Sequence, residues 1–87
     1  MRKFLIAYEH KNKSRDYTAF FESIKGLGTS WWHYLDTVWI VKTTKNASDI
    51  FASIEPHIDK ETDLIFINEI SPDQQGWLPK KAWEWMH

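Results

Sequence analysis

The chain lacks cysteine entirely. This absence excludes disulfide bonds, thiolate metal sites and cysteine nucleophiles. The chain also lacks a surplus of charge, because 11 Lys and Arg residues stand against 12 Asp and Glu residues and give a formal net charge of −1. Such a balance provides no overall attraction to nucleic acid phosphates, so binding of that kind needs a local basic patch.

No apolar segment at the N-terminus is long enough for a signal peptide or a membrane span. The chain has no repeat, no low-complexity segment and no linker long enough to divide it, so we expect one domain over residues 1–87. A domain of this size buries only about 60 to 65% of its unfolded surface, which makes dimerisation a simple source of added stability. We expect a cytoplasmic protein with no membrane partner.

Tryptophan is the outlier in the composition, with six residues. An indole is large and carries an N–H group that needs a partner, so this number indicates extensive aromatic packing in a core or an interface. Residues 31–44 (WWHYLDTVWIVKTT) read as two strands joined at Asp36 and Thr37, the pattern of a β-hairpin. Successive side chains of a strand point to opposite faces, so Trp31 and Trp32 place large apolar groups on both faces of the hairpin.

Two further strands are predicted at residues 3–9 and 64–70, which are short runs with apolar side chains on both sides. Such runs are typical of strands covered on both faces, at or beside the centre of a sheet.

Two helices are predicted from apolar periodicity. The first stripe begins at Tyr17 and ends at Gly26 and Gly28, and the second follows Asn46 and is interrupted by Pro56. The last eight residues, 80–87, predict a short terminal helix that presents tryptophan side chains.

The order of elements is strand, helix, strand, strand, helix, strand. With right-handed crossovers this order gives an α+β, ferredoxin-like βαββαβ fold, in which an antiparallel sheet carries both helices on one face. The last strand then lies beside the first, followed by the third and the second. The helix-free face would expose more apolar surface than a monomer normally shows, so we expect the C-terminal tail, a partner chain or a flat ligand to cover it.

Several segments together resemble a family of small bacterial and phage proteins labelled "SinR family". The segments are Tyr8-Glu9 at the end of the first strand, WWHYLD at 31–36, VWIVKT at 38–43, PHID at 56–59 and GWLP at 76–79. The resemblance covers nearly the whole chain, and nothing in it resembles the helix-turn-helix regulator of the same name.

These proteins are distantly similar to the small nuclease subunit of CRISPR adaptation and to VapD-type toxins, which share a ferredoxin-like fold and dimerise. In the nucleases an acidic residue at the end of the first strand pairs with its copy across the dimer and holds a divalent metal. The matching residue here is Glu9, where the resemblance implies Asp. Mg²⁺ tolerates misplaced ligands poorly, and the longer Glu side chain displaces the carboxylate relative to Asp. Two interpretations of Glu9 therefore stay open: a catalytic metal ligand, or a polar strand end paired with Lys11 or Arg15.

Other candidate site residues are basic or imidazole side chains. Lys11, Lys13 and Arg15 form the local basic cluster near a strand end, which predicts either a phosphate-binding patch or a solvated loop. The four histidines show neither helical i, i+4 spacing nor a metal-binding motif, and His33 is expected to pack within the hairpin.

The aromatic residues have two open interpretations. Trp32, Tyr34 and Trp39, with Lys42 nearby, are candidates for stacking a nucleobase on the sheet. The alternative is packing in a dimer core or against the tail, which would involve Trp31, Trp32, Trp39, Trp77, Trp83 and Trp85.

The sequence therefore predicts a small homodimeric binding protein without catalytic machinery of its own and without a defined cofactor. Nucleotide or nucleic acid is the first-ranked ligand because the resemblance points there. One alternative is a Mg²⁺-dependent nuclease that uses Glu9 of both subunits. Another is a protein-interaction module, such as a phage-encoded inhibitor or a protein that sequesters a nucleotide signal.

Overall fold

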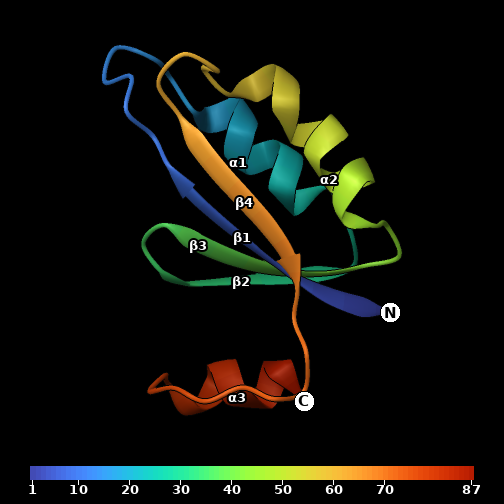
Figure 1. Ribbon diagram of the computed structural model, residues 1–87. Helices are drawn as coiled ribbons and strands as arrows, with labels where there is room; N and C mark the ends of the chain where they lie inside the picture. The colour runs from blue at the N-terminus through green and yellow to red at the C-terminus, as the bar shows by residue number, and fades with distance from the viewer.

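The computed structural model describes residues 1–87 and has a ferredoxin-like fold with one added helix (Figure 1). The sheet has four antiparallel strands in the order β2-β3-β1-β4, which confirms the predicted topology. None of the helices has the length and apolar character needed to span a bilayer. The elements in chain order are β1 (Arg2–Glu9), α1 (Thr18–Lys25), β2 (Ser30–Leu35), β3 (Val38–Thr43), α2 (Ala47–Ile54), the 3-10 turn η1 (Glu55–His57), β4 (Leu64–Glu69) and α3 (Lys80–Met86).

The main core lies between the sheet and the helices α1 and α2, which share one face (Figure 1). Alternate residues of the central strand β1 point into this core, and both helices contribute the apolar stripe that the sequence predicts. The buried members are Phe4, Ile6, Tyr8, Phe20, Ile24, Leu27, Trp39, Val41, Ile50 and Ile54.

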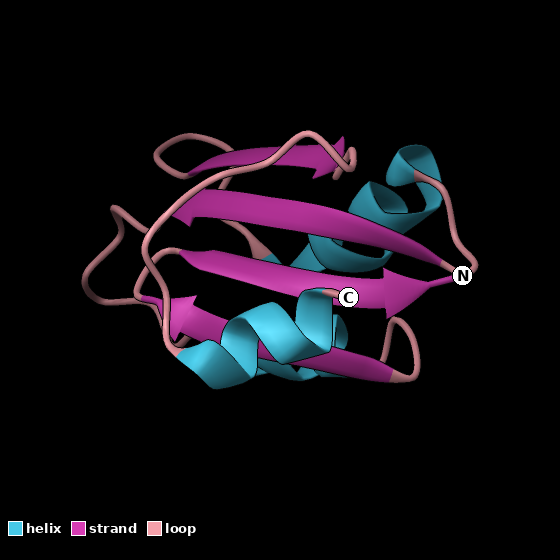
Figure 2. Ribbon diagram, turned by 90° about the horizontal axis from the view of Figure 1, so that it is seen from below, coloured by secondary structure: helices cyan, strands magenta, loops and turns pink.

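A second, smaller core lies on the opposite face, under α3. Trp32 of β2 and Ile40 of β3 pack there against Ala82 and Met86 of α3, and all four side chains are buried. This contact confirms that the C-terminal tail covers the hairpin. Figure 2 shows α3 lying across one half of the sheet and leaving the β1 and β4 half outside its reach.

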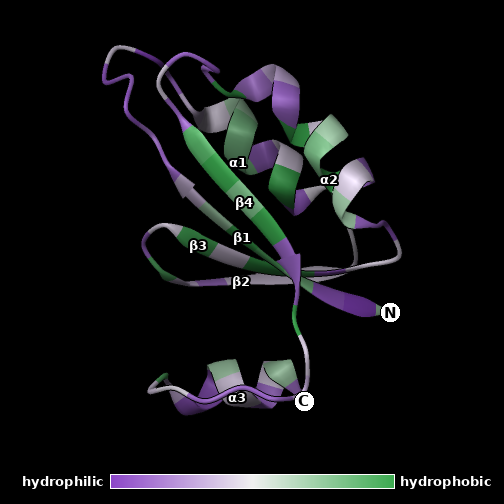
Figure 3. Ribbon diagram, in the orientation of Figure 1, coloured by the Kyte–Doolittle hydropathy of each residue, from purple (hydrophilic) through white to green (hydrophobic).

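Strand β4 lies at an edge of the sheet and not at its centre, with only β1 beside it. It is nevertheless one of the most hydrophobic segments of the chain (Figure 3). Its inner side chains Ile65 and Ile67 pack on the main core, whereas Leu64 and Phe66 on the outer face are 57% and 62% exposed. The run of apolar residues in β4 therefore reflects a covered inner face and an outer face whose two large apolar side chains are more than half exposed.

The connections follow the predicted signals with one exception. The Asn46 side chain caps α2 by accepting a hydrogen bond from the Asp49 N–H at 2.8 Å, and Pro56 lies in the separate turn η1. Gly26 follows the last residue of α1. Gly28, however, does not cap a helix: its backbone lies directly against the backbone of Lys42 in β3.

Candidate functional site

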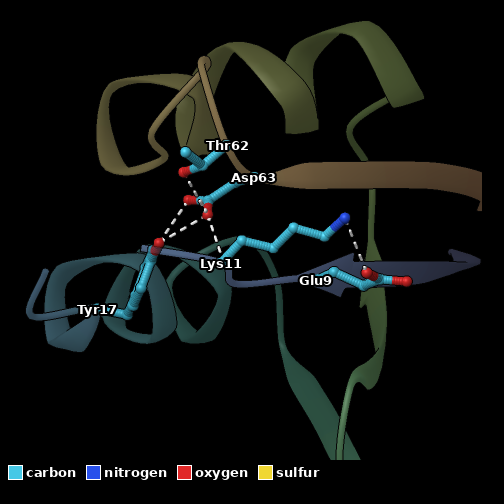
Figure 4. Close-up of polar contacts among 5 residues, drawn as sticks. All are labelled: Glu9, Lys11, Tyr17, Thr62 and Asp63. Carbon is cyan, nitrogen blue, oxygen red and sulfur yellow. Dashed lines mark hydrogen bonds and ion pairs between the residues drawn. The ribbon is translucent and has the colours of Figure 1, made fainter. Parts of the chain in front are cut away.

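The predicted metal ligand Glu9 ends β1 with an exposed side chain. Its carboxylate lies 3.6 Å from Nζ of Lys11, and both side chains are more than half exposed (Figure 4). An exposed ion pair of this kind contributes little to stability. No group of three or more His, Asp or Glu side chains lies close enough together to hold a metal ion. Within one copy of the chain, Glu9 is a polar strand end paired with Lys11, and its role as a metal ligand shared across a dimer stays a prediction.

The basic cluster after β1 does not converge on a single point. Lys11 turns toward Glu9, while the guanidinium of Arg15 lies 5.9 Å from the ring centre of Tyr17. Lys13 is exposed in the loop between them. Two of the three cations are thus engaged by neighbouring side chains of the same copy, and the phosphate-binding patch stays a prediction.

Asp63, immediately before β4, is the buried charged residue of the structure. Its carboxylate accepts hydrogen bonds from the Lys11 backbone N–H at 2.9 Å and from the Tyr17 hydroxyl at 2.7 Å (Figure 4). It also accepts one from the Asp59 backbone N–H at 2.9 Å. Burial raises the pKa of Asp63, but these donors outweigh burial and lower the pKa to about 2. The ionised carboxylate thus ties the loop after β1 to the start of β4.

Acid is expected to weaken this connection. Because the pKa of Asp63 is lowered from 3.8 to about 2 by folding, its stabilising effect is complete above pH 4 and is lost as the pH falls toward 2. We expect a loss of about 1 to 2 kcal/mol in the free energy of unfolding over this range, after allowance for solvent screening. Urea unfolding at several pH values measures it, and the Asp63→Asn variant should lack this component. If the free energy of unfolding fell equally with pH in the wild type and in Asp63→Asn, Asp63 would not be the source of the acid sensitivity.

His10 packs between two tyrosine rings. It stacks on Tyr17 with ring centres 3.6 Å apart and planes 4° apart, and on Tyr8 at 4.5 Å. Burial lowers the pKa of His10, while the charge of Asp63 acts in the opposite direction. The ring therefore fills space between the two tyrosines.

On the inner face of the hairpin, Trp39 and His33 are fixed by one hydrogen-bond chain. The buried indole N–H of Trp39 donates to the Tyr8 hydroxyl at 3.0 Å, and this hydroxyl donates to the backbone carbonyl of Asp36 at 3.1 Å. Nε2 of His33 lies 3.0 Å from the same carbonyl. Because a carbonyl only accepts, Nε2 carries the hydrogen in this contact. Both rings are thus held in place by hydrogen bonds within the chain.

On the outer face, Trp32 is only 4% exposed beneath α3. It cannot present a ring face to a ligand in this arrangement, which corrects its prediction as a stacking residue and supports its alternative role in packing against the tail. Lys42 is also engaged by the tail, since its Nζ lies 4.4 Å from the ring centre of Trp85. Tyr34 remains 46% exposed and contacts Trp32 edge-on.

The other tail tryptophans differ in their surroundings. Trp85 packs at the margin of the second core, as predicted. Trp83 is half-buried beside Gly76 of the same tail. Trp77 is 98% exposed, so it makes no packing contact within one copy of the chain.

The sheet is not covered evenly on its inner face, because a hollow remains between α1 and the edge strand β2. We call this hollow of about 410 Å³ the aromatic groove. Trp39 forms its buried floor, with the ring of His33 stacked on it at 4.2 Å and Trp31 tilted against it at 4.8 Å. Trp31 is 40% exposed, and Nζ of Lys25 lies 5.4 Å from the centre of its ring. Its lining residues are Phe21 and Lys25 of α1, Trp31 and His33 of β2, and Trp39 of β3.

Comparisons with protein-family models, with curated proteins and with solved structures find no match to this chain. The resemblance that the sequence suggests therefore stays a prediction. The function is proposed below from the chain's own surfaces.

Of the predicted ligand contacts, the aromatic groove contains only Trp39. The sequence predicts packing roles for Trp31 and His33, and it assigns no site role to Phe21 or Lys25 of the first helix. Two signals point to the groove in retrospect. Trp31 and His33 lie two residues apart on one face of a strand, and Phe21 and Lys25 lie four residues apart on one side of a helix.

Proposed function

We propose that this chain is a small binding protein that works as a homodimer and takes a nucleotide or nucleic acid as its ligand without transforming it. The observation that best supports the dimer is the exposed apolar edge formed by β4. This strand is an edge strand whose outer side chains Leu64 and Phe66 are both more than half exposed. An apolar edge without protection is a template for pairing with another strand.

The two edges of the sheet differ in their protection. Strand β2 has an irregular register between Trp32 and Leu35, and such irregularities disfavour pairing with another chain. Strand β4 pairs with β1 without interruption, and it contains no proline or lysine. Its charged residue, Glu69, lies at its end and is paired with Arg2 at 3.3 Å. Edge-to-edge association is therefore expected at β4.

A second copy bound at the β4 edge would also cover the apolar side chains beside this edge. A two-fold axis through β4 would pair the strand with itself in antiparallel fashion and join both sheets into one. In the register that brings the apolar residues together, Leu64 of one copy would lie opposite Phe66 of the other. A hollow of about 290 Å³ beside them, lined by Ala7, Glu9 and Thr37 among others, would lie next to the same interface.

This arrangement favours binding over the metal-dependent nuclease. In a dimer joined through β4, the two β1 strands are separated by both copies of β4, which places the Glu9 backbones at least about 14 Å apart across the sheet. Two carboxylates at that separation do not share one Mg²⁺ ion.

Sedimentation equilibrium at micromolar concentration tests the proposal. We expect a dimer, and we expect Phe66→Lys to raise its dissociation constant at least about 100-fold, because a two-fold interface contains each substitution twice. Leu35→Lys is the matched control, since Leu35 is an exposed apolar residue at the opposite edge and should leave the dimer intact. A wild-type monomer at these concentrations would overturn the dimer. Mg²⁺-dependent cleavage that Glu9→Ala abolishes would overturn the absence of catalysis.

A further inference from the structure

We propose that the aromatic groove is the ligand site and that it takes a nucleobase with its attached phosphate. The inference rests on the proposed binding function and gives it a location. A nucleobase is flat and apolar on both faces, and its phosphate is anionic. The groove offers aromatic rings together with one lysine at its rim, Lys25.

The exposed ring of Trp31 fits a flat ligand. The ring of His33 already has one face stacked on Trp39, with centres 4.2 Å and planes 19° apart, whereas Trp31 is tilted against Trp39 with planes 49° apart. Trp31 is 40% exposed, so a base can stack on its open side at the usual separation of about 3.5 to 4.0 Å. Trp39, buried beneath, limits how deep the base can enter.

The rings of the floor are already ordered. His33 is fixed by its contact with the Asp36 carbonyl, and Trp39 by its hydrogen bond to Tyr8. A ligand that stacks on preordered rings loses less free energy to side-chain ordering than one that binds mobile side chains. Trp31 is the exception. Its ring is 40% exposed and is therefore free to adjust its position to a bound base.

The charge at the rim is supplied by Lys25. Its Nζ lies over the Trp31 ring and 4.0 Å from the Glu22 carboxylate, a distance at the limit for an ion pair. A bound phosphate would attract the same ammonium group, and Glu22 would compete with it. Neutralising Glu22 is therefore expected to strengthen binding, while removing the charge of Lys25 is expected to weaken it.

Fluorescence anisotropy with a labelled oligothymidylate tests the site on the full chain. Trp31→Ala is expected to weaken binding about 10- to 100-fold, the range for loss of one base-stacking ring. Lys25→Gln should weaken binding several-fold and lower the slope of log affinity against log salt by about one, the value for one phosphate contact. Glu22→Gln should strengthen binding. Leu35→Ala, on the same strand and 46% exposed, should bind as the wild type does.

Unlabelled competitors identify the chemistry that is recognised. We expect thymidine monophosphate to compete more weakly than the oligonucleotide, and inorganic phosphate not to compete at all, since stacking supplies most of the affinity. Competition by inorganic phosphate alone would overturn the nucleobase assignment. Because Lys25 is exposed, its variant reports on the site even if Trp31→Ala does not fold.

Two failures can be told apart. If the wild type binds and neither Trp31→Ala nor Lys25→Gln changes the affinity, the groove is not the site, while the proposed binding function stands. If the wild type binds neither mononucleotide nor oligonucleotide, the ligand class of the proposed function is also wrong. The dimer is measured independently of both results.

Discussion

Replacing Gly28 by alanine is expected to lower the free energy of unfolding by about 3 kcal/mol. A Cβ atom at Gly28 would lie 1.8 Å from the carbonyl oxygen of Lys42 and 2.9 Å from Cα of Thr43. Both contacts are with backbone, so no side chain can move aside. The segment is also tied to β3 by the hydrogen bond from the Thr29 N–H to the Lys42 carbonyl at 3.1 Å. Relief would require separating the hairpin from the end of α1.

Gly26→Ala is the matched control for this substitution. A Cβ atom at Gly26 would meet only ordinary contacts at 3.7 Å, and the residue already has right-handed helical angles. Alanine there is expected to be neutral or stabilising by up to about 1 kcal/mol. Chemical denaturation of both variants measures the difference, and equal stability of the two variants would show that the backbones are not in close contact.

The second large effect is expected at α3. Met86→Ala should lower the free energy of unfolding by about 2 to 4 kcal/mol, because Met86 is 5% exposed and fills the second core against Trp32 and Ile40. Truncation also loosens the cover over the hairpin, so the emission of Trp32 should shift toward that of a solvated indole. Denaturant unfolding followed by fluorescence reports both changes.

Trp77→Ala is the control for Met86→Ala within the same tail. It removes a larger side chain, but one that is 98% exposed, so the expected change is within about 0.5 kcal/mol. If Met86→Ala were as stable as the wild type, α3 would not be docked on the sheet in solution.

Local patterns predicted most of the fold. The alternation of Trp31 and Trp32 predicted a hairpin with two apolar faces, and the aromatic terminal segment predicted its cover. The position of β4 was harder to predict, because a strand buried on both faces and an edge strand that lacks its partner have the same apolar pattern. The strand order alone placed it at the edge.

The site depended on features that no local pattern carries. Asp63 lies in a polar turn that reads as solvated, yet its partners Lys11 and Tyr17 are 52 and 46 residues away in the chain. The aromatic groove is lined by residues of α1, β2 and β3, which only the folded arrangement brings together. Likewise, Gly28 reads as a helix end until the backbone of β3 is placed against it.

Hydrogen exchange along β4 at low and high protein concentration examines most directly the claim that a second copy covers this edge. An edge strand in a monomer exposes half of its amide groups to water, whereas strand pairing protects them. We predict that the outward amides between Leu64 and Glu69 become protected as the concentration rises, and that Phe66→Lys removes this protection. Exchange that is fast and independent of concentration along the whole of this edge would contradict the account.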